Sequence, residues 1–174
     1  PGPIDSNGKE LFVYDKGTKR ILKYTINNGN LISPEVFRDG VPPITSMAYF
    51  RDGIVVSRTN EVFYYARKTD ESIAVAPGFN IRKVVASGQQ DLLILDKGSR
   101  IRKVKVVEQP RIVTWTRAGE WTPFDPLEVD IIDMAVSDKF IYLLDAMTNI
   151  YKFTKGGSYV GIWREGKGFI PQLP

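Results

Sequence analysis

The sequence predicts an all-β protein built from about four repeated, four-stranded antiparallel sheets. The hairpin-like segment "LFVYDKGTKRILKYT" at residues 11–25 has a close copy, "LLILDKGSRIRKVKV", at residues 92–106. Short runs rich in Val, Ile, Tyr and Phe alternate with turn residues along the chain, which is typical of strands. No window shows the i, i+3, i+4, i+7 apolar spacing of a helix.

Four copies of one unit account for nearly all of the 174 residues. The second predicted strand of each unit starts at Leu11, Ile54, Leu92 and Ile141, which are 43, 38 and 49 residues apart. A polar turn and a third strand follow each time, starting at Arg20, Glu61, Arg100 and Asn149. The fourth strands fall in residues 34–40, 72–78, 111–117 and 159–165, and the first strands that are preserved fall in residues 44–50, 81–87 and 131–137. Four strands in about 40–50 residues are the repeat of a β-propeller blade, so the sequence predicts a β-propeller.

Residues 1–174 are predicted to form a single propeller or part of one. Its blades cover residues 1–40, 41–79, 80–119 and 129–168. A loop insertion is expected at residues 118–130. Only ten residues precede Leu11, so the first blade is expected to lack most of its innermost strand. We consider three explanations: a fragment of a larger propeller with about six to eight blades, a ring completed by a second chain, or a four-bladed ring closed by the tail at residues 168–174. The first two are favoured.

Two polar residue types recur at fixed places in the unit. Aspartates end the second strand at Asp15, Asp96 and Asp145, and are expected to accept hydrogen bonds from turn amides. Lysines recur in the third strand at Lys23, Lys103 and Lys152. Their aliphatic stems are expected to cover apolar surface while the ammonium groups reach water.

The composition limits the chemistry. The chain has no cysteine and no histidine, which excludes disulfides, thiolate metal sites and a Ser-His-Asp triad. A metal would need oxygen ligands, which favours calcium or magnesium. The net charge of +4 permits an acidic partner. We do not expect nucleic-acid binding, because no recognised motif accompanies the cations. The sequence contains no run of about 18 apolar residues, so it predicts no membrane span in this segment. We assign no catalytic residue and no metal ligand.

The predicted contact surface is the rim formed by the loops after the second strands and the loops between blades. It is expected to carry Lys16, Lys19, Arg20, Arg58, Lys97, Arg100, Trp121 and Phe124. The two aromatic residues belong to the insertion "AGEWTPFDPLEVD". They either anchor a partner or fold back to fill the gap between blades.

The "DKG" turn followed by "RI" and a lysine resembles the hairpin of NHL-type propellers and of the related six-bladed gluconolactonase-like group. Similarity to the lactonases implies a calcium site at the channel mouth, held by Glu, Asn and Asp, but those ligands do not map onto positions of this sequence. WD-repeat propellers fit less well because the Trp-Asp dipeptide is missing.

We therefore predict a non-catalytic β-propeller module that serves as a platform for protein–protein recognition or assembly. Its partner is expected to be another protein, or a second copy joined through open blade edges. Two alternatives remain: a calcium-dependent hydrolase of the lactonase type, and a glycan-binding propeller in which Trp and Tyr stack on sugar rings.

Overall fold

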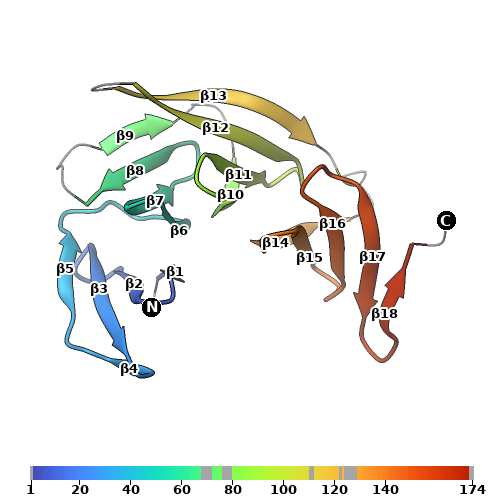
Figure 1. Ribbon diagram of the computed structural model, residues 1–174, viewed down its shortest axis with the longest axis horizontal. Coiled ribbons are helices and arrows are strands. Elements are labelled where there is room, and N and C mark those ends of the chain that lie inside the picture. The colour runs from blue at the N-terminus through green and yellow to red at the C-terminus, as the bar shows by residue number, and fades with distance from the viewer. Residues whose placement is uncertain are drawn as a thin grey trace. The chain divides into compact units, whose positions relative to one another are not determined.

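The computed structural model describes residues 2–67, 72–75, 80–109, 112–121, 123 and 129–172. Every regular element within these ranges is a β-strand, and all of the strand pairs are antiparallel (Figure 1). The predicted all-β class is therefore confirmed. The part of the chain that the structure describes contains no helix long and apolar enough to span a membrane.

The chain divides into two compact units, Pro1–Val84 and Val85–Pro174. The first unit contains two sheets and the start of a third. The first sheet contains β1 (Ile4–Ser6), β2 (Glu10–Asp15), β3 (Arg20–Asn27) and β5 (Glu35–Arg38), with the short β4 (Asn30–Leu31) also paired to β3. The second sheet contains β6 (Ser46–Phe50), β7 (Gly53–Ser57), β8 (Val62–Ala66) and β9 (Ser72–Val75). As predicted, the innermost strand of the first sheet is short, with three residues.

Two further sheets follow in the same strand order. The third sheet contains β10 (Ile81–Ala86), β11 (Asp91–Asp96), β12 (Ile101–Gln109) and β13 (Ile112–Trp121). The fourth contains β14 (Ile131–Val136), β15 (Phe140–Asp145), β16 (Ile150–Thr154), β17 (Tyr159–Arg164) and β18 (Gly168–Pro171). The four predicted copies of the unit thus correspond to four sheets.

The structure corrects the predicted start of the insertion. Residues 118–121 were expected to open a loop, but they continue β13, because Gly119 and Trp121 pair with Lys103 and Ile101 of β12. The third sheet therefore extends to Trp121. The backbone pairing with a long β12 extends the strand beyond the point where the sequence suggests a loop.

The structure also corrects the proposed role of the tail. Residues 168–171 form β18, which pairs with β17 as a fifth strand of the fourth sheet and does not complete the first sheet. Gly161 of β17 permits this close approach, because a Cβ atom there would lie 2.6 Å from the carbonyl oxygen of Ile170. The explanation in which the tail supplies the missing strand of the first blade is therefore wrong.

Each sheet has two faces, and alternation along the second strand assigns residues to them. In the first unit, Phe12 and Tyr14 of β2 share one buried core with Ile54 and Val56 of β7. We call the face carrying Phe12 and Tyr14 the leading face of its sheet, and the face carrying Ile54 and Val56 the trailing face. A leading face thus packs on the trailing face of the next sheet.

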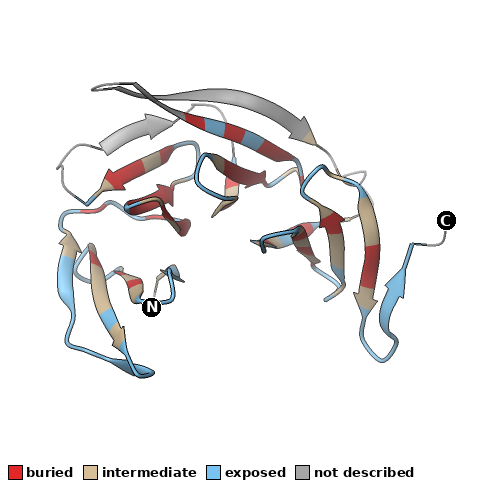
Figure 2. Cartoon of the chain, in the orientation of Figure 1, coloured by how far each residue is buried: buried red, intermediate tan, exposed pale blue. Residues whose placement is uncertain are grey.

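The second unit repeats this arrangement. Leu93 and Leu95 of β11 occupy the positions of Phe12 and Tyr14. They share a buried core with Ile141 and Leu143 of β15 on the trailing face of the fourth sheet. Figure 2 shows these buried strand segments, and shows β18 as exposed and β5 as partly exposed. The same strand positions therefore build the sheet-to-sheet core in both units.

Candidate binding surfaces

The turns after the second strands are organised by the recurring aspartates. Asp15 accepts a hydrogen bond from the amide of Gly17 at 2.9 Å, and Asp96 accepts from the amides of Gly98 and Arg100 at 2.8 and 3.0 Å. Asp145 accepts from the amides of Met147 and Asn149 at 2.9 and 2.8 Å. The predicted role of these aspartates is confirmed. They shape the rim and are held by its backbone.

The turns after β2 and β11 lie beside the segments that lead to the next sheet. In the first unit, the amide of Val41 donates to the carbonyl of Lys19 at 2.8 Å. In the second unit, the Ser99 hydroxyl donates to the carbonyl of Val129 at 3.1 Å and accepts from the amide of Ile131 at 3.0 Å. In each unit, the turn after one second strand is therefore hydrogen-bonded to a segment that connects two sheets.

The predicted rim cations divide into two kinds. The lysines Lys16, Lys19 and Lys97 are exposed. The arginines have partners within the chain. Arg20 forms two hydrogen bonds with Asp39, at 3.0 and 3.1 Å, and Arg100 approaches Asp96 at 3.2 Å. The Arg58 guanidinium lies 4.4 Å from the centre of the Phe63 ring. Arg58 also lines a hollow of about 680 Å³ in the first unit, together with Pro42, Pro43, Ile44, Thr45, Thr59, Asn60 and Glu61.

Trp121, a predicted rim residue, packs against another sheet and lines a pocket. Phe124 lies outside the described residues. The Trp121 ring meets the edge of Phe153, with 4.7 Å between ring centres and 75° between ring planes. Trp121 therefore folds back against the fourth sheet, as one of the two interpretations of the sequence expected. It is only half-buried, and its indole also lines a pocket.

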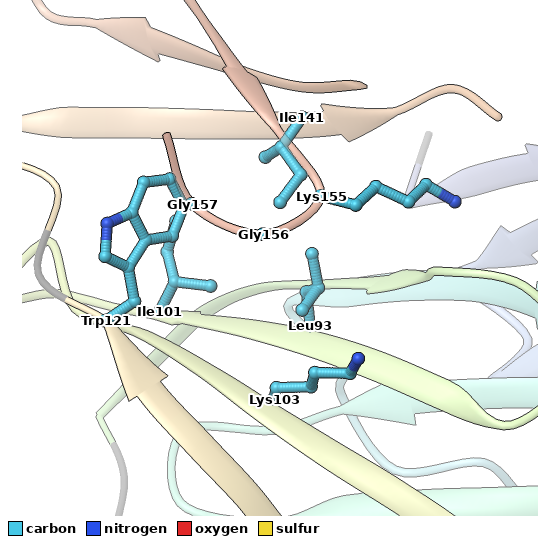
Figure 3. Close-up of a pocket in the computed structure, with 8 residues that line it drawn as sticks. All are labelled: Leu93, Ile101, Lys103, Trp121, Ile141, Lys155, Gly156 and Gly157. Atoms are coloured by element: carbon cyan, nitrogen blue, oxygen red, sulfur yellow. The ribbon is translucent and has the colours of Figure 1, made fainter. Parts of the chain in front are cut away.

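This pocket, which we call the Trp121 pocket, has a volume of about 300 Å³ and lies within the second unit. Figure 3 shows Trp121 on one side, Lys103 and Lys155 on the other, and Leu93 and Ile141 between them. Ile101, Gly156 and Gly157 complete the lining. Gly157 has a φ of +91°, which glycine adopts readily, and this turn places its backbone beside the indole of Trp121. Apolar walls with two cations form a site for an apolar group next to a negative charge.

The sequence did not indicate this pocket. It did point to Lys103 as one of the recurring lysines, and the pairing of β12 with β13 places that residue near Trp121. Only the packing of the third sheet on the fourth brings Lys155, Gly156 and Gly157 to Trp121. A pocket between two sheets leaves no signal in the spacing of either repeat.

The recurring lysines have partners that the sequence did not predict. Lys23 lies 2.9 Å from Glu35 and 3.7 Å from Glu10, and Lys103 lies 2.9 Å from Asp91. The Lys152 ammonium lies over aromatic rings, 3.9 Å from the centre of Phe140, 5.8 Å from Trp163 and 5.6 Å from Phe169. The expectation that these ammonium groups simply reach water is therefore wrong for Lys23 and Lys152.

Within the described ranges, no group of three or more acidic side chains is placed to hold a metal ion. The groups with lowered pKa values belong to turns and ion pairs. Burial alone would raise the pKa of Asp145, but hydrogen bonds from Asn149, Tyr151 and Met147 outweigh it and lower the pKa. Hydrogen bonding from Arg67 lowers the pKa of Glu10.

Comparison with solved structures supports a β-propeller fold. The chain resembles the β-propeller domain of Myceliophteria thermophila Cps50 (Swd1), with a TM-score of 0.64 and 7% identity over 99% of this chain and 58% of that chain. It also resembles the N-terminal domain of Nup159, with a TM-score of 0.57 and 12% identity over 90% of this chain and 45% of that chain. The chain has a β-propeller fold.

A third similar structure comes from the complex of S. cerevisiae Dbp5 bound to Nup159, Gle1, IP6 and ADP. Its TM-score is 0.54, with 11% identity over 99% of this chain and 43% of that chain. This chain thus spans about half the length of these solved chains. No protein-family model and no curated protein matches the sequence.

Proposed function

We propose that this β-propeller is a non-catalytic module that recognises a protein partner, and that the Trp121 pocket receives an apolar side chain from an acidic segment of that partner. The observation that carries the proposal is the combination of a half-buried tryptophan, apolar walls and two lysines in one pocket of about 300 Å³. Pockets of this kind typically hold a buried anchor side chain with polar groups at the edge.

The apolar walls supply the binding energy in this proposal. Leu93, Ile101 and Ile141 surround the space beside the indole. Burying one leucine-sized side chain there contributes about 1.5–3 kcal/mol. Trp121 is already held by Phe153, so little side-chain freedom is lost when a partner binds.

The lysines supply the preference for an acidic segment. Lys155 is exposed at the turn between β16 and β17, and Lys103 is held 2.9 Å from Asp91. Lys155 therefore offers the more accessible charge to an incoming carboxylate. The chain's net charge of +4 also favours encounter with an acidic partner.

The three similar structures support a binding role only by analogy of fold. One of them comes from a complex of several proteins, which is consistent with such a role. We also propose that the hairpins are of the NHL type. Their "DKG" turns, at residues 15–17 and 96–98, shape the rim of the sheets.

A random peptide library displayed on phage and selected on the immobilised chain tests this function. We expect enrichment of peptides that place Leu, Phe or Trp next to Asp or Glu, with binding reduced about tenfold by Trp121→Ala or by Lys155→Glu. Lys167→Glu is the matched control, since Lys167 is exposed in another turn of the same sheet. Selection without such a consensus, or binding insensitive to both pocket variants, would overturn the proposal.

A sugar ring is a second candidate occupant, because an indole face beside an open turn can stack on a pyranose. Trp121 lies beside the Gly157 backbone and lines the pocket together with Gly156 and Gly157. A glycan array probed with the wild type and with Trp121→Ala separates the two. Binding to glycans that is lost in Trp121→Ala would favour this candidate over the peptide.

A further inference from the structure

The leading face of the fourth sheet is an apolar surface that remains partly open. Its cross-strand row runs through Leu144, Ile150, Trp163 and Phe169, which are direct register partners on β15, β16, β17 and β18. Ile150 and Phe169 are each 39% exposed. The corresponding leading-face residues of the third sheet, Leu95 and Ile101, are almost fully buried against the fourth sheet.

The trailing face of the first sheet is also open. Its cross-strand row runs through Ile4, Val13, Leu22 and Val36. Ile4 is 58% exposed and Val36 is 53% exposed. On the second sheet, the trailing-face residues Ile54 and Val56 are fully buried. Contiguous exposed apolar residues of this kind are typical of surfaces that another chain covers.

The two sheet-to-sheet cores show which residues meet when a leading face packs on a trailing face. In the second unit, Trp121 of β13 meets Phe153 of β16 at 4.7 Å. In the first unit, the Arg38 guanidinium of β5 lies 5.3 Å from the Tyr65 ring of β8. The residue from the outer strand therefore contacts an aromatic residue of the third strand in both cores.

The strand registers identify the equivalent residues on the two open faces. Arg38, Trp121 and Trp163 are the register partners of the equivalent residues Ile21, Ile101 and Ile150. Tyr65 and Phe153 are the register partners of Ile54 and Ile141, and Tyr24 is the partner of the equivalent Leu11. On the fourth sheet, Trp163 is thus equivalent to Arg38 and Trp121. On the first sheet, Tyr24 is equivalent to Tyr65 and Phe153.

From these equivalences we infer that the leading face of the fourth sheet packs on the trailing face of the first sheet in a second copy of this chain, with Trp163 against Tyr24. The contact continues an interface that the chain already forms twice within itself. The open face of the fourth sheet is rich in aromatic residues and that of the first sheet in aliphatic residues, so the two faces are complementary. The surface is separate from the Trp121 pocket, so this inference goes beyond the proposed function.

The length of the similar solved chains agrees with this inference. The chain spans 43–58% of the three solved chains that it resembles, so two copies together have about the length of one of them. The contact is head-to-tail, because the two faces that meet are different.

Cysteine cross-linking tests the contact directly, since the natural chain contains no cysteine. Tyr24→Cys and Trp163→Cys are purified separately, mixed, and treated with a short bis-maleimide. We expect a covalent dimer in the mixture and only background dimer in either variant alone. Adding Leu144→Asp to the Trp163→Cys chain should abolish the dimer, because a buried carboxylate on the apolar face is costly.

Two controls make each result decisive. Trp121→Cys with Phe153→Cys in one chain shows that the reagent bridges a known ring contact, and a mixture of Lys97→Cys with Lys167→Cys chains gives the background for exposed positions. The inference is overturned if the Tyr24 and Trp163 mixture stays at background while the Trp121 and Phe153 pair reacts. It is also overturned if a chain carrying both Tyr24→Cys and Trp163→Cys links within itself at the mass of one chain.

Discussion

The hydroxyl of Tyr151 donates a hydrogen bond to the Asp145 carboxylate at 2.9 Å. The same carboxylate accepts from the side-chain amide of Asn149 at 2.8 Å and from two turn amides. Tyr151 also packs against the core of the second unit. One aspartate therefore ties the turn after β15 to the core beneath it.

Replacing Asp145 should destabilise the propeller. Asp145→Ala leaves several donors without their acceptor, and we expect a loss of about 2–3 kcal/mol in the free energy of unfolding. Urea unfolding followed by circular dichroism measures this loss. Asp138→Ala is the control, since Asp138 is exposed in the turn between β14 and β15 and its change should stay within about 0.5 kcal/mol. An equal loss in both variants would contradict the role of Asp145.

The Asp145 and Tyr151 pair should make stability fall at both extremes of pH. Hydrogen bonding outweighs burial and lowers the pKa of Asp145, so its contribution is present above about pH 4 and is lost as the pH falls further. Burial, followed by the hydrogen bond to Asp145, raises the pKa of Tyr151 to about 12. Its contribution is therefore complete below about pH 10 and is lost as the pH rises through 12.

The urea midpoint measured across pH, in the wild type and in Tyr151→Phe, checks this expectation. Tyr151→Phe should remove part of the alkaline loss. An alkaline limb that is identical in the two proteins would show that Tyr151 does not titrate in the way that its surroundings predict.

The edge-to-face contact of Trp121 with Phe153 should appear as a coupling energy. In a double-mutant cycle with Trp121→Leu and Phe153→Leu, we expect the pair to contribute about 0.5–1.5 kcal/mol beyond the separate effects. The free energies of unfolding of the four proteins give this value. Strict additivity would mean that the two rings do not stabilise each other.

Calcium should leave the thermal stability of the chain unchanged if the module is non-catalytic. A ligand that binds only the folded protein raises the melting temperature. The melting temperature in millimolar calcium is compared with that in a chelator, with magnesium as the control ion. A rise specific to calcium would favour the lactonase-type alternative.

The strands were predictable because the apolar repeat marks their positions. Leu92 and Ile141 begin equivalent predicted strands, and both lie in the second strand of their sheets, β11 and β15. The turn aspartates were predictable for a related reason, since their hydrogen bonds are formed with residues two to four positions away.

Features that depend on contacts between distant strands were not predictable. The β18 strand has only four residues and ends in a proline, so its pairing depends on the open space above Gly161. The partners of Lys152 come from three different strands. The Trp121 pocket likewise depends on how one sheet packs on the next, which no single repeat encodes.

Light scattering of the wild-type chain over a concentration series tests most directly whether the open faces of the first and fourth sheets join copies of the chain. We predict that the mass rises from the 19.6 kDa of one chain to twice that value or more as the concentration increases. Leu144→Asp should hold the mass at that of one chain. A wild-type mass of 19.6 kDa at every concentration would contradict the account.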